Sequence, residues 1–172
     1  MKTIYECLQS KSVKWVSAIF YAVVILSVFV LMYLVAKGIY NLIIAWVIMA
    51  LILIPSILSF FIFPMYIVAD DEGVGVRTLA RTKQIPYENI DRIVRVDEQP
   101  LFSPISTIRL FGSGGVFGYI GWFRSKGIGT FLSYATDEKN VFLIYRKKGK
   151  PVAISVNDPD EFMPYYLKGG EK

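Results

Sequence analysis

The sequence predicts a membrane-inserted helical hairpin followed by a small, mainly β domain, and three observations support this fold class. Hydrophobic residues make up 54% of the chain, whereas soluble domains contain roughly 45–50%. Two long segments carry no charged residue. After the second segment, short β-branched and aromatic runs alternate with glycine-rich and polar turns, which is a pattern typical of strands.

Residues 1–14 are expected to form a cytoplasmic tail, and residues 15–36 are expected to form the first transmembrane helix. No charge occurs between Trp15 and Ala36, and about 20 apolar helical residues cross a bilayer. Trp15 and Tyr33 lie near the two ends, where aromatic rings favour the membrane interface. A buried core helix is the alternative, but the remaining chain is too short to cover two such helices.

A short extracytoplasmic turn is predicted at residues 37–41, and a second transmembrane helix is predicted at residues 42–63. The second charge-free segment, residues 39–69, is longer than one crossing requires. Pro64 divides this segment, because proline disfavours helix at the residue before it. Pro55 is expected to kink the second helix.

The distribution of basic residues predicts the orientation of the hairpin. Basic residues occur near its two outer ends, at Lys2, Lys11, Lys14, Arg77, Arg81 and Lys83. The turn contains only Lys37. The positive-inside rule therefore places both termini in the cytoplasm. Neither helix contains a charge that could mark an ion pathway, so the hairpin is interpreted as a membrane anchor.

Residues 65–168 are predicted to form a bent sheet or split barrel of about seven strands. Pro64 ends the second helix, so the first strand is expected at Met65–Ala69, which is β-branched and aromatic. Further strands are predicted at Gly75–Leu79, Asp91–Val96, Thr107–Phe111, Tyr119–Phe123, Thr130–Ala135, Val141–Arg146 and Val152–Val156. Each is short and is separated from the next by polar or glycine-rich residues.

A C-terminal helix is expected to cap this sheet. Asp158 is a suitable N-cap, and Pro159 fits the first helical turn. An apolar face is expected from Phe162, Tyr165, Tyr166 and Leu167. The helix is predicted to end before residues 169–172, which form a short tail.

The densest motif lies between residues 112 and 129, where seven of the 13 glycines are interleaved with aromatic residues. Glycine within strand sequence marks bends or close backbone approach, so one interpretation is a bent hairpin with locally packed aromatics. The other is an exposed interaction surface formed by Phe117, Tyr119, Trp122, Phe123, Arg124 and Lys126. Trp122 and Phe123 must point to opposite faces of a strand. At least one large aromatic is therefore exposed or covered from outside the sheet.

A basic cluster at Arg146, Lys147, Lys148 and Lys150 is interpreted as a hairpin turn. It is either a solvated turn or a weak site for anionic lipid. Near a membrane surface each basic residue contributes about 1 kcal/mol of attraction to anionic lipids.

The residue types present do not indicate catalysis. Histidine is absent, which removes the commonest general base and metal ligand. Cys7 is the single cysteine, and no nucleophile–base or metal-ligand spacing occurs. The net charge of +5 is too small to indicate nucleic-acid binding. We therefore expect no cofactor, no metal and no small-molecule substrate.

Several segments resemble bacterial pleckstrin-homology-like (PH-like) domains, namely YIVADDEGVGVR, IPYENIDRI and AISVNDPDEF. The long segment RLFGSGGVFGYIGWFRSKGIGTFLSYATD is similar to the central region of a membrane-anchored subgroup. The resemblance covers about residues 65–168. It implies a seven-stranded bent sheet with a C-terminal helix, in a bacterial cytoplasmic membrane protein without enzymatic activity. It supplies no binding residues that can be carried over.

The sequence thus predicts a non-enzymatic, membrane-anchored interaction module. Its partners are expected to be membrane lipid headgroups, an unknown protein partner, or a second copy of the chain. The alternative is an accessory subunit of a larger membrane enzyme or transporter complex.

Overall fold

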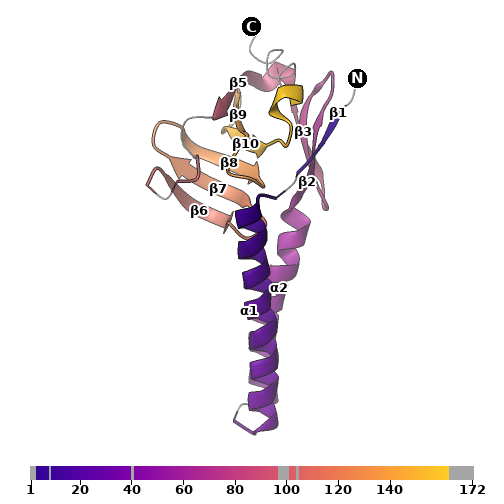
Figure 1. Cartoon of the computed structure of the whole chain (residues 1–172), viewed down its shortest axis with the longest axis vertical. Coiled ribbons are helices and arrows are strands. Elements are labelled where there is room, and N and C mark those ends of the chain that lie inside the picture. The colour runs from indigo at the N-terminus through magenta and orange to yellow at the C-terminus, as the bar shows by residue number, and fades with distance from the viewer. Residues whose placement is uncertain (1–2, 8, 40, 97–100, 104, 163–172) are drawn as a thin grey trace.

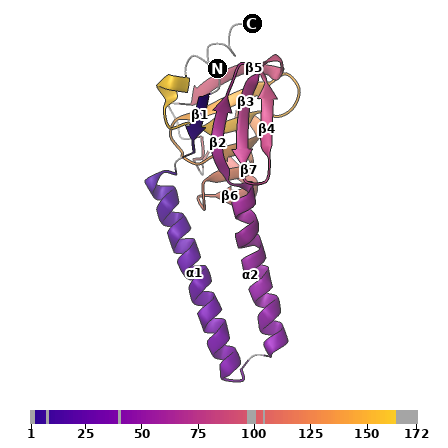
Figure 2. The same cartoon turned by 90° about the vertical axis from the view of Figure 1, so that its right-hand side faces the viewer.

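A computed structural model of the chain describes residues 3–7, 9–39, 41–96, 101–103 and 105–162. Two long helices extend from one end of a β domain that contains two sheets (Figure 1). The helices lie side by side and antiparallel, and a tight turn joins them at the end far from the β domain (Figure 2).

The helix pair forms where the charge-free segments predict it. α1 spans Lys11–Ala36 and α2 spans Leu42–Ile62. The side chains of Ser10 and Asn41 cap the two helices by accepting hydrogen bonds from backbone N–H groups of the first turns. α1 begins earlier than expected, within the predicted N-terminal tail, and α2 ends just before Pro64 as predicted.

Both helices are strongly apolar. α1 is long and apolar enough to cross a membrane, and it is the one span of this kind in the described part of the chain. The apolar helical segment Leu42–Leu58 of α2 is shorter. Pro55 lies inside α2, and the hydroxyl of Ser56 donates a hydrogen bond to the Ile52 carbonyl at 2.8 Å, near this proline.

The first sheet has four antiparallel strands in the order β1-β2-β3-β4. Their bounds are β1 Thr3–Glu6, β2 Pro64–Ala69, β3 Gly73–Thr78 and β4 Thr82–Pro86. β1 leads toward α1 and β2 follows α2, and these two strands pair with each other. The helix pair is therefore continuous with a hydrogen-bonded sheet.

The second sheet has six strands in the order β5-β9-β10-β8-β7-β6. Their bounds are β5 Ile90–Val96, β6 Thr107–Gly114, β7 Tyr119–Ser125, β8 Gly129–Ala135, β9 Val141–Arg146 and β10 Val152–Ser155. A 3₁₀ turn at Tyr87–Asn89 connects the two sheets. β10 and β8 are parallel, and the other neighbours are antiparallel.

The hydrophobic core has two parts, one on each face of the six-stranded sheet. The inner core lies between the sheets and includes Ile67, Val76, Phe142 and Ile154, all buried. The outer core lies on the opposite face, where Leu101 and Phe102 pack against β7, β8 and β9. The loop between β5 and β6 thus supplies a cover for the outer face.

The predicted C-terminal helix begins as expected. Residues 159–162 are helical, and Asp158 accepts a hydrogen bond from the backbone N–H of Glu161 at 3.1 Å. Phe162 is fully buried and contacts Tyr5 of β1 edge to face. The rest of this helix, including Tyr165, Tyr166 and Leu167, and the tail at residues 169–172 lie outside the described residues.

The strand predictions from Met65–Ala69 to Val152–Val156 are confirmed with small changes in their bounds. The expectation of about seven strands for the β domain is too low, because nine of the ten described strands, β2 to β10, lie between Pro64 and Ser155. β1 and β4 were not predicted from the sequence. The sheets remain two separate layers and do not close into a barrel.

Candidate functional site

The β6–β7 hairpin contains the glycine-rich residues predicted as an interaction surface. Gly112 of β6 lies opposite Gly121 of β7. A Cβ atom at Gly112 would lie 2.1 Å from the Ile120 carbonyl oxygen, and one at Gly121 would lie 2.2 Å from the Phe111 carbonyl oxygen. Both positions also have positive φ angles. Glycine is required here because the two backbones approach closely, as the bent-hairpin interpretation expects.

Trp122 and Phe123 point to opposite faces of β7, as predicted. Trp122 is half-buried against the inner core, and the Lys150 ammonium lies 5.1 Å from its ring centroid. Phe123 is 3% exposed and packs on Phe131 in the outer core, with ring centroids 6.0 Å apart. Phe123 therefore does not belong to an accessible surface, which corrects that part of the prediction. The cause is the β5–β6 loop, which covers the outer face with Phe102.

Tyr119 lies at the margin of the outer core. Its ring stacks on Phe102 with centroids 4.2 Å apart, and its hydroxyl hydrogen-bonds the Glu138 carboxylate at 3.3 Å. Burial, together with the negative charge of Glu138, raises the pKa of Tyr119. Beside it is a groove of about 610 Å³ whose lining includes Arg109. The sequence does not indicate this groove, because the groove depends on where the β5–β6 loop folds.

Phe117, in the turn of the β6–β7 hairpin, contacts both helices. Its backbone N–H donates a hydrogen bond to the Ser17 hydroxyl of α1 at 2.8 Å. Its ring lies 5.4 Å from the Tyr21 ring and 5.9 Å from the Phe63 ring at the end of α2, measured between centroids. Phe117 also has a positive φ of 60°, an uncommon conformation for a non-glycine residue. This turn fixes the β domain to the helix pair.

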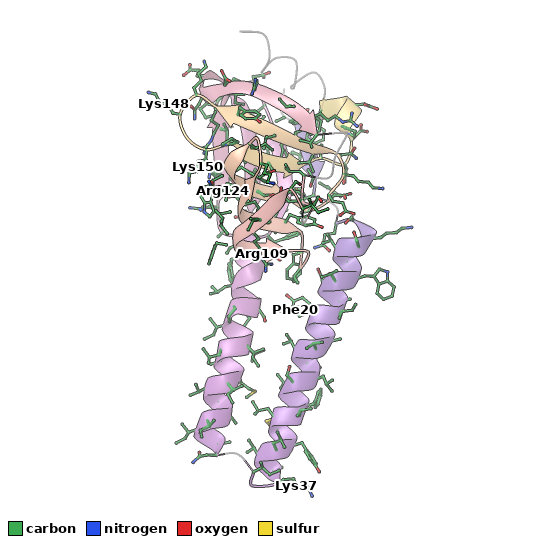
Figure 3. All side chains as sticks on the ribbon, turned by 90° about the vertical axis from the view of Figure 1, so that its left-hand side faces the viewer. Phe20, Lys37, Arg109, Arg124, Lys148 and Lys150 are labelled. Atoms are coloured by element: carbon green, nitrogen blue, oxygen red, sulfur yellow. The ribbon has the colours of Figure 1, made fainter. Side chains whose placement is uncertain are left out.

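The predicted basic residues divide between two places. Arg124 and Lys150 lie on the same side of the β domain, whereas Lys148 lies at the end far from the helices (Figure 3). Lys147 and Lys148 form an exposed hairpin turn, in which the Lys148 N–H donates to the Asn89 side chain at 2.9 Å. Lys126 is exposed at the end of β7.

Two basic residues from the other sheet join this region. Lys83 of β4 lies over the Tyr134 ring, 5.9 Å from its centroid. Burial and the positive charges of Arg146 and Arg81 lower the pKa of Lys83. Burial raises the pKa of Tyr134, and the neighbouring Arg81 and Arg146 oppose this rise. Basic residues near the four-stranded sheet therefore lie close to Arg146 of the six-stranded sheet.

We define the basic cluster as Arg81, Lys83, Arg124, Arg146 and Lys150. In the part of the chain that the structure describes, none of these residues has a carboxylate within ion-pair distance. The Arg146 side chain donates from Nε to the Lys150 carbonyl oxygen at 2.7 Å, which fixes its position. Arg124 lies on the same face of β7 as Trp122, since the two residues are two positions apart. The cluster is thus a concentration of uncompensated positive charge around two aromatic rings.

The described residues show no arrangement suited to a metal ion, since no group of three or more potential ligands comes together among them. Cys7 is buried, and this burial raises the pKa of its thiol to about 12. The thiol is therefore protonated at neutral pH and is a poor nucleophile.

A two-sheet β domain with a basic margin and a C-terminal helical turn has the features of an interaction domain of the PH-like class. A family model, described as a bacterial PH domain, matches residues 65–168. This match covers more than half of the chain, and the chain belongs to the bacterial PH domain family. PH domains are generally non-catalytic, and this membership supports an interaction module. Comparisons with curated proteins and with solved structures gave no match.

Proposed function

We propose that this chain is a non-enzymatic, membrane-anchored module whose PH-like domain binds anionic lipid headgroups at the cytoplasmic surface of a bacterial inner membrane. The observation that carries the proposal is the basic cluster. It brings together five cations that have no carboxylate partner among the described residues, on a domain fixed to two apolar helices. In this proposal both helices cross the bilayer, and both chain termini are cytoplasmic.

The fixed position of the domain supports this function. β1 pairs with β2, and Phe117 contacts α1 and the end of α2. Such contacts hold the β domain close to the membrane if the helices are inserted. Tethering raises the effective concentration of headgroups, so that weak individual contacts suffice for occupancy.

The charge of the cluster supports an anionic ligand. Each basic residue near an anionic surface contributes about 1 kcal/mol of attraction. Burial lowers the pKa of Lys83, and the positive charges of Arg146 and Arg81 lower it further. A phosphate-bearing headgroup would neutralise these charges, and Trp122 and Tyr134 would suit the amphipathic membrane interface.

A protein partner is the second candidate, and the groove beside Tyr119 favours it. This groove has an aromatic wall of Phe102, Tyr119 and Phe123, with Arg109 and Glu138 also in its lining. It could accept an apolar side chain flanked by polar groups, as expected for an accessory subunit of a larger membrane complex.

Lipid selectivity can be tested by native mass spectrometry of the full-length protein released from mixed phosphatidylcholine and phosphatidylglycerol micelles. Lys83→Gln/Lys150→Gln removes two cations from the cluster. Lys139→Gln/Lys148→Gln is the matched control, because it removes the same charge at exposed positions outside the cluster. We expect the cluster variant to lose about 2 kcal/mol of selectivity for phosphatidylglycerol, or about 30-fold, and the control to lose little. Equal losses in both variants would contradict the proposal.

Topology can be tested by cysteine labelling of intact cells in a Cys7→Ser background. An impermeant reagent should label Ile39→Cys in the helix–helix turn and should not label Asn140→Cys in the β domain. The reverse pattern would place the β domain outside the cell and exclude the cytoplasmic surface as its binding site.

A further inference from the structure

β6 carries an exposed apolar surface that no part of the described protein covers. Ile105, just before the strand, is 91% exposed, Ile108 is 67% exposed, Leu110 is 54% exposed and Phe111 is 74% exposed. We call these four residues the apolar edge. Three of them belong to β6, the last strand of the six-stranded sheet, and Ile105 lies two residues before it. Among the described strands, β6 pairs only with β7. An exposed apolar edge of this kind promotes aggregation unless something covers it.

We propose that the apolar edge inserts into the interfacial layer of the bilayer, so that the β domain lies on the membrane along β6. This inference rests on the proposed membrane insertion of the helices. The apolar edge adjoins the basic cluster, because Ile108 and Phe111 pair with Arg124 and Trp122 of β7. Its ligand is the apolar boundary of the lipid layer rather than a headgroup charge.

The turn of the β6–β7 hairpin contacts α1 near the start of its apolar part, which places β6 at the level of the membrane interface. The Phe117 ring contacts Tyr21, which lies seven residues after Lys14, the last charged residue before the apolar part of α1. At 1.5 Å per residue, Tyr21 is about 10 Å further along the helix. The C-terminal end of β6 therefore lies beside the beginning of the membrane-spanning segment.

The direction of the strand agrees with this placement. β6 is the strand of the six-stranded sheet that lies closest to the helix pair, and it runs across the end of the domain from which the helices emerge (Figures 1 and 2). Arg109, the third residue of β6, lies at this same end (Figure 3). The Arg109 side chain lines the groove beside Tyr119 and Phe123, on the face of the sheet opposite to Ile108.

The irregular shape of β6 argues against a second copy as the cover. The register with β7 shifts between Arg109 and Phe111, so Leu110 is an extra residue in the strand. Such a bulge twists the edge and interrupts the regular series of hydrogen-bonding groups that strand addition needs. The interfacial layer has no such requirement, because water and headgroups can hydrogen-bond an open edge there. The hydrocarbon centre is excluded for the same reason.

The inference can be tested by electron paramagnetic resonance on the full chain in nanodiscs of phosphatidylcholine and phosphatidylglycerol. Single cysteines at Ile108, Phe111, Lys148 and Leu26 are spin-labelled in a Cys7→Ser background. Labels at positions 108 and 111 should collide more with oxygen than with a water-soluble nickel chelate. The label at position 148 should show the opposite preference.

Leu26, in the middle of α1, separates the two hypotheses. A water-exposed label at position 26 would contradict helix insertion and, with it, the proposed function. A lipid-exposed label at position 26 with water-exposed labels at 108 and 111 would overturn the apolar-edge inference alone. Labels at 108 and 111 that are shielded from both reagents and broadened by spin–spin coupling would identify a second copy as the cover, which also overturns it. Ile105→Cys provides a further position if either labelled variant fails to melt like the unlabelled protein.

Discussion

β9 and β6 belong to one sheet and both carry large apolar residues, yet these residues lie in opposite environments. Val141, Phe142, Leu143 and Ile144 of β9 are all buried, because β5 and β10 flank the strand and both of its faces are covered. β6 has one neighbour among the described strands, and its apolar side chains are exposed. The comparison shows that apolar strand residues in this chain occur in two environments. Those of β9 lie in the interior of the domain, and those of β6 lie on the surface next to the helices.

The largest expected difference between the two strands is in stability. Phe142→Ala should reduce the free energy of unfolding by about 3–5 kcal/mol, because it removes a fully buried ring. Phe111→Ala should change it by no more than about 0.5 kcal/mol, as for other exposed positions. Denaturant unfolding in detergent, followed by near-ultraviolet circular dichroism, measures both. A comparable loss in the two variants would mean that β6 is part of the folded core.

In β7, two adjacent residues differ in their environment, because Trp122 is half-buried and Phe123 is buried. Phe123→Ala should cost about 3 kcal/mol, since its ring lies in the outer core. Trp122→Ala should cost less, because the ring is half-buried, but it should also weaken lipid selectivity by releasing Lys150. Unfolding and native mass spectrometry of the same two variants give the comparison. If both variants lose stability equally and neither changes lipid binding, Trp122 is only structural.

β1 is also an edge strand, and it provides the contrast with β6. Tyr5 is buried, and its hydroxyl donates to the Glu161 carbonyl oxygen at 3.1 Å. Cys7, which follows β1, is buried as well, and burial raises its pKa from 9.0 to about 12. The edge strand β1 is therefore covered on one face, whereas the apolar side chains of β6 are exposed.

The raised thiol pKa of Cys7 makes a pH-dependent prediction. Above pH 9 the unfolded chain loses the thiol proton while the folded chain keeps it, so stability must fall as the pH rises from about 9 toward 12. The expected loss is about 1.4 kcal/mol at pH 10. Cys7→Ala should lack this component, so the difference between the two unfolding curves isolates it from the titration of tyrosines and lysines. Parallel pH profiles would show that the thiol is accessible to water.

The sequence predicts much of the fold because its strongest signals are local. Pro64 and the length of the charge-free segment predict the end of α2 and the start of β2, and the bounds of β9 follow from its apolar residues alone. β1 was missed because TIYE is short and acquires its structure by pairing with β2. β4 was missed because TKQIP is polar and ends in proline, so only pairing with β3 makes it a strand.

The site was less predictable because it depends on contacts between distant elements. Arg81 and Lys83 could be counted as basic residues near the membrane, but nothing local indicates that β4 places them beside Tyr134 and Arg146. The residues of the apolar edge had the pattern of a normal strand. Their exposure follows from the position of β6 at the end of the strand order, which is a property of the whole sheet.

The smallest expected effect concerns the contact that fixes the position of β6. The Ser17 hydroxyl accepts a hydrogen bond from the Phe117 N–H at 2.8 Å and donates one to the Val13 carbonyl at 2.7 Å. Ser17→Ala should cost about 1 kcal/mol, as expected for one hydrogen bond. Ser27→Ala is the matched control, because Ser27 bonds only within α1 in the described residues.

Hydrogen exchange of full-length protein in nanodiscs can measure this effect locally. Ser17→Ala should accelerate exchange at the Phe117 amide and in the turn at residues 115–118, and Ser27→Ala should not. If neither variant changes this turn, the hydrogen bond does not hold the β domain on the helices. The depth of β6 would then rest on Tyr21, Phe63 and the β1–β2 pairing alone. Because the apolar edge needs a fixed height above the helices to reach the bilayer, faster exchange at Phe117 in Ser17→Ala should be accompanied by reduced lipid exposure of a label at position 111.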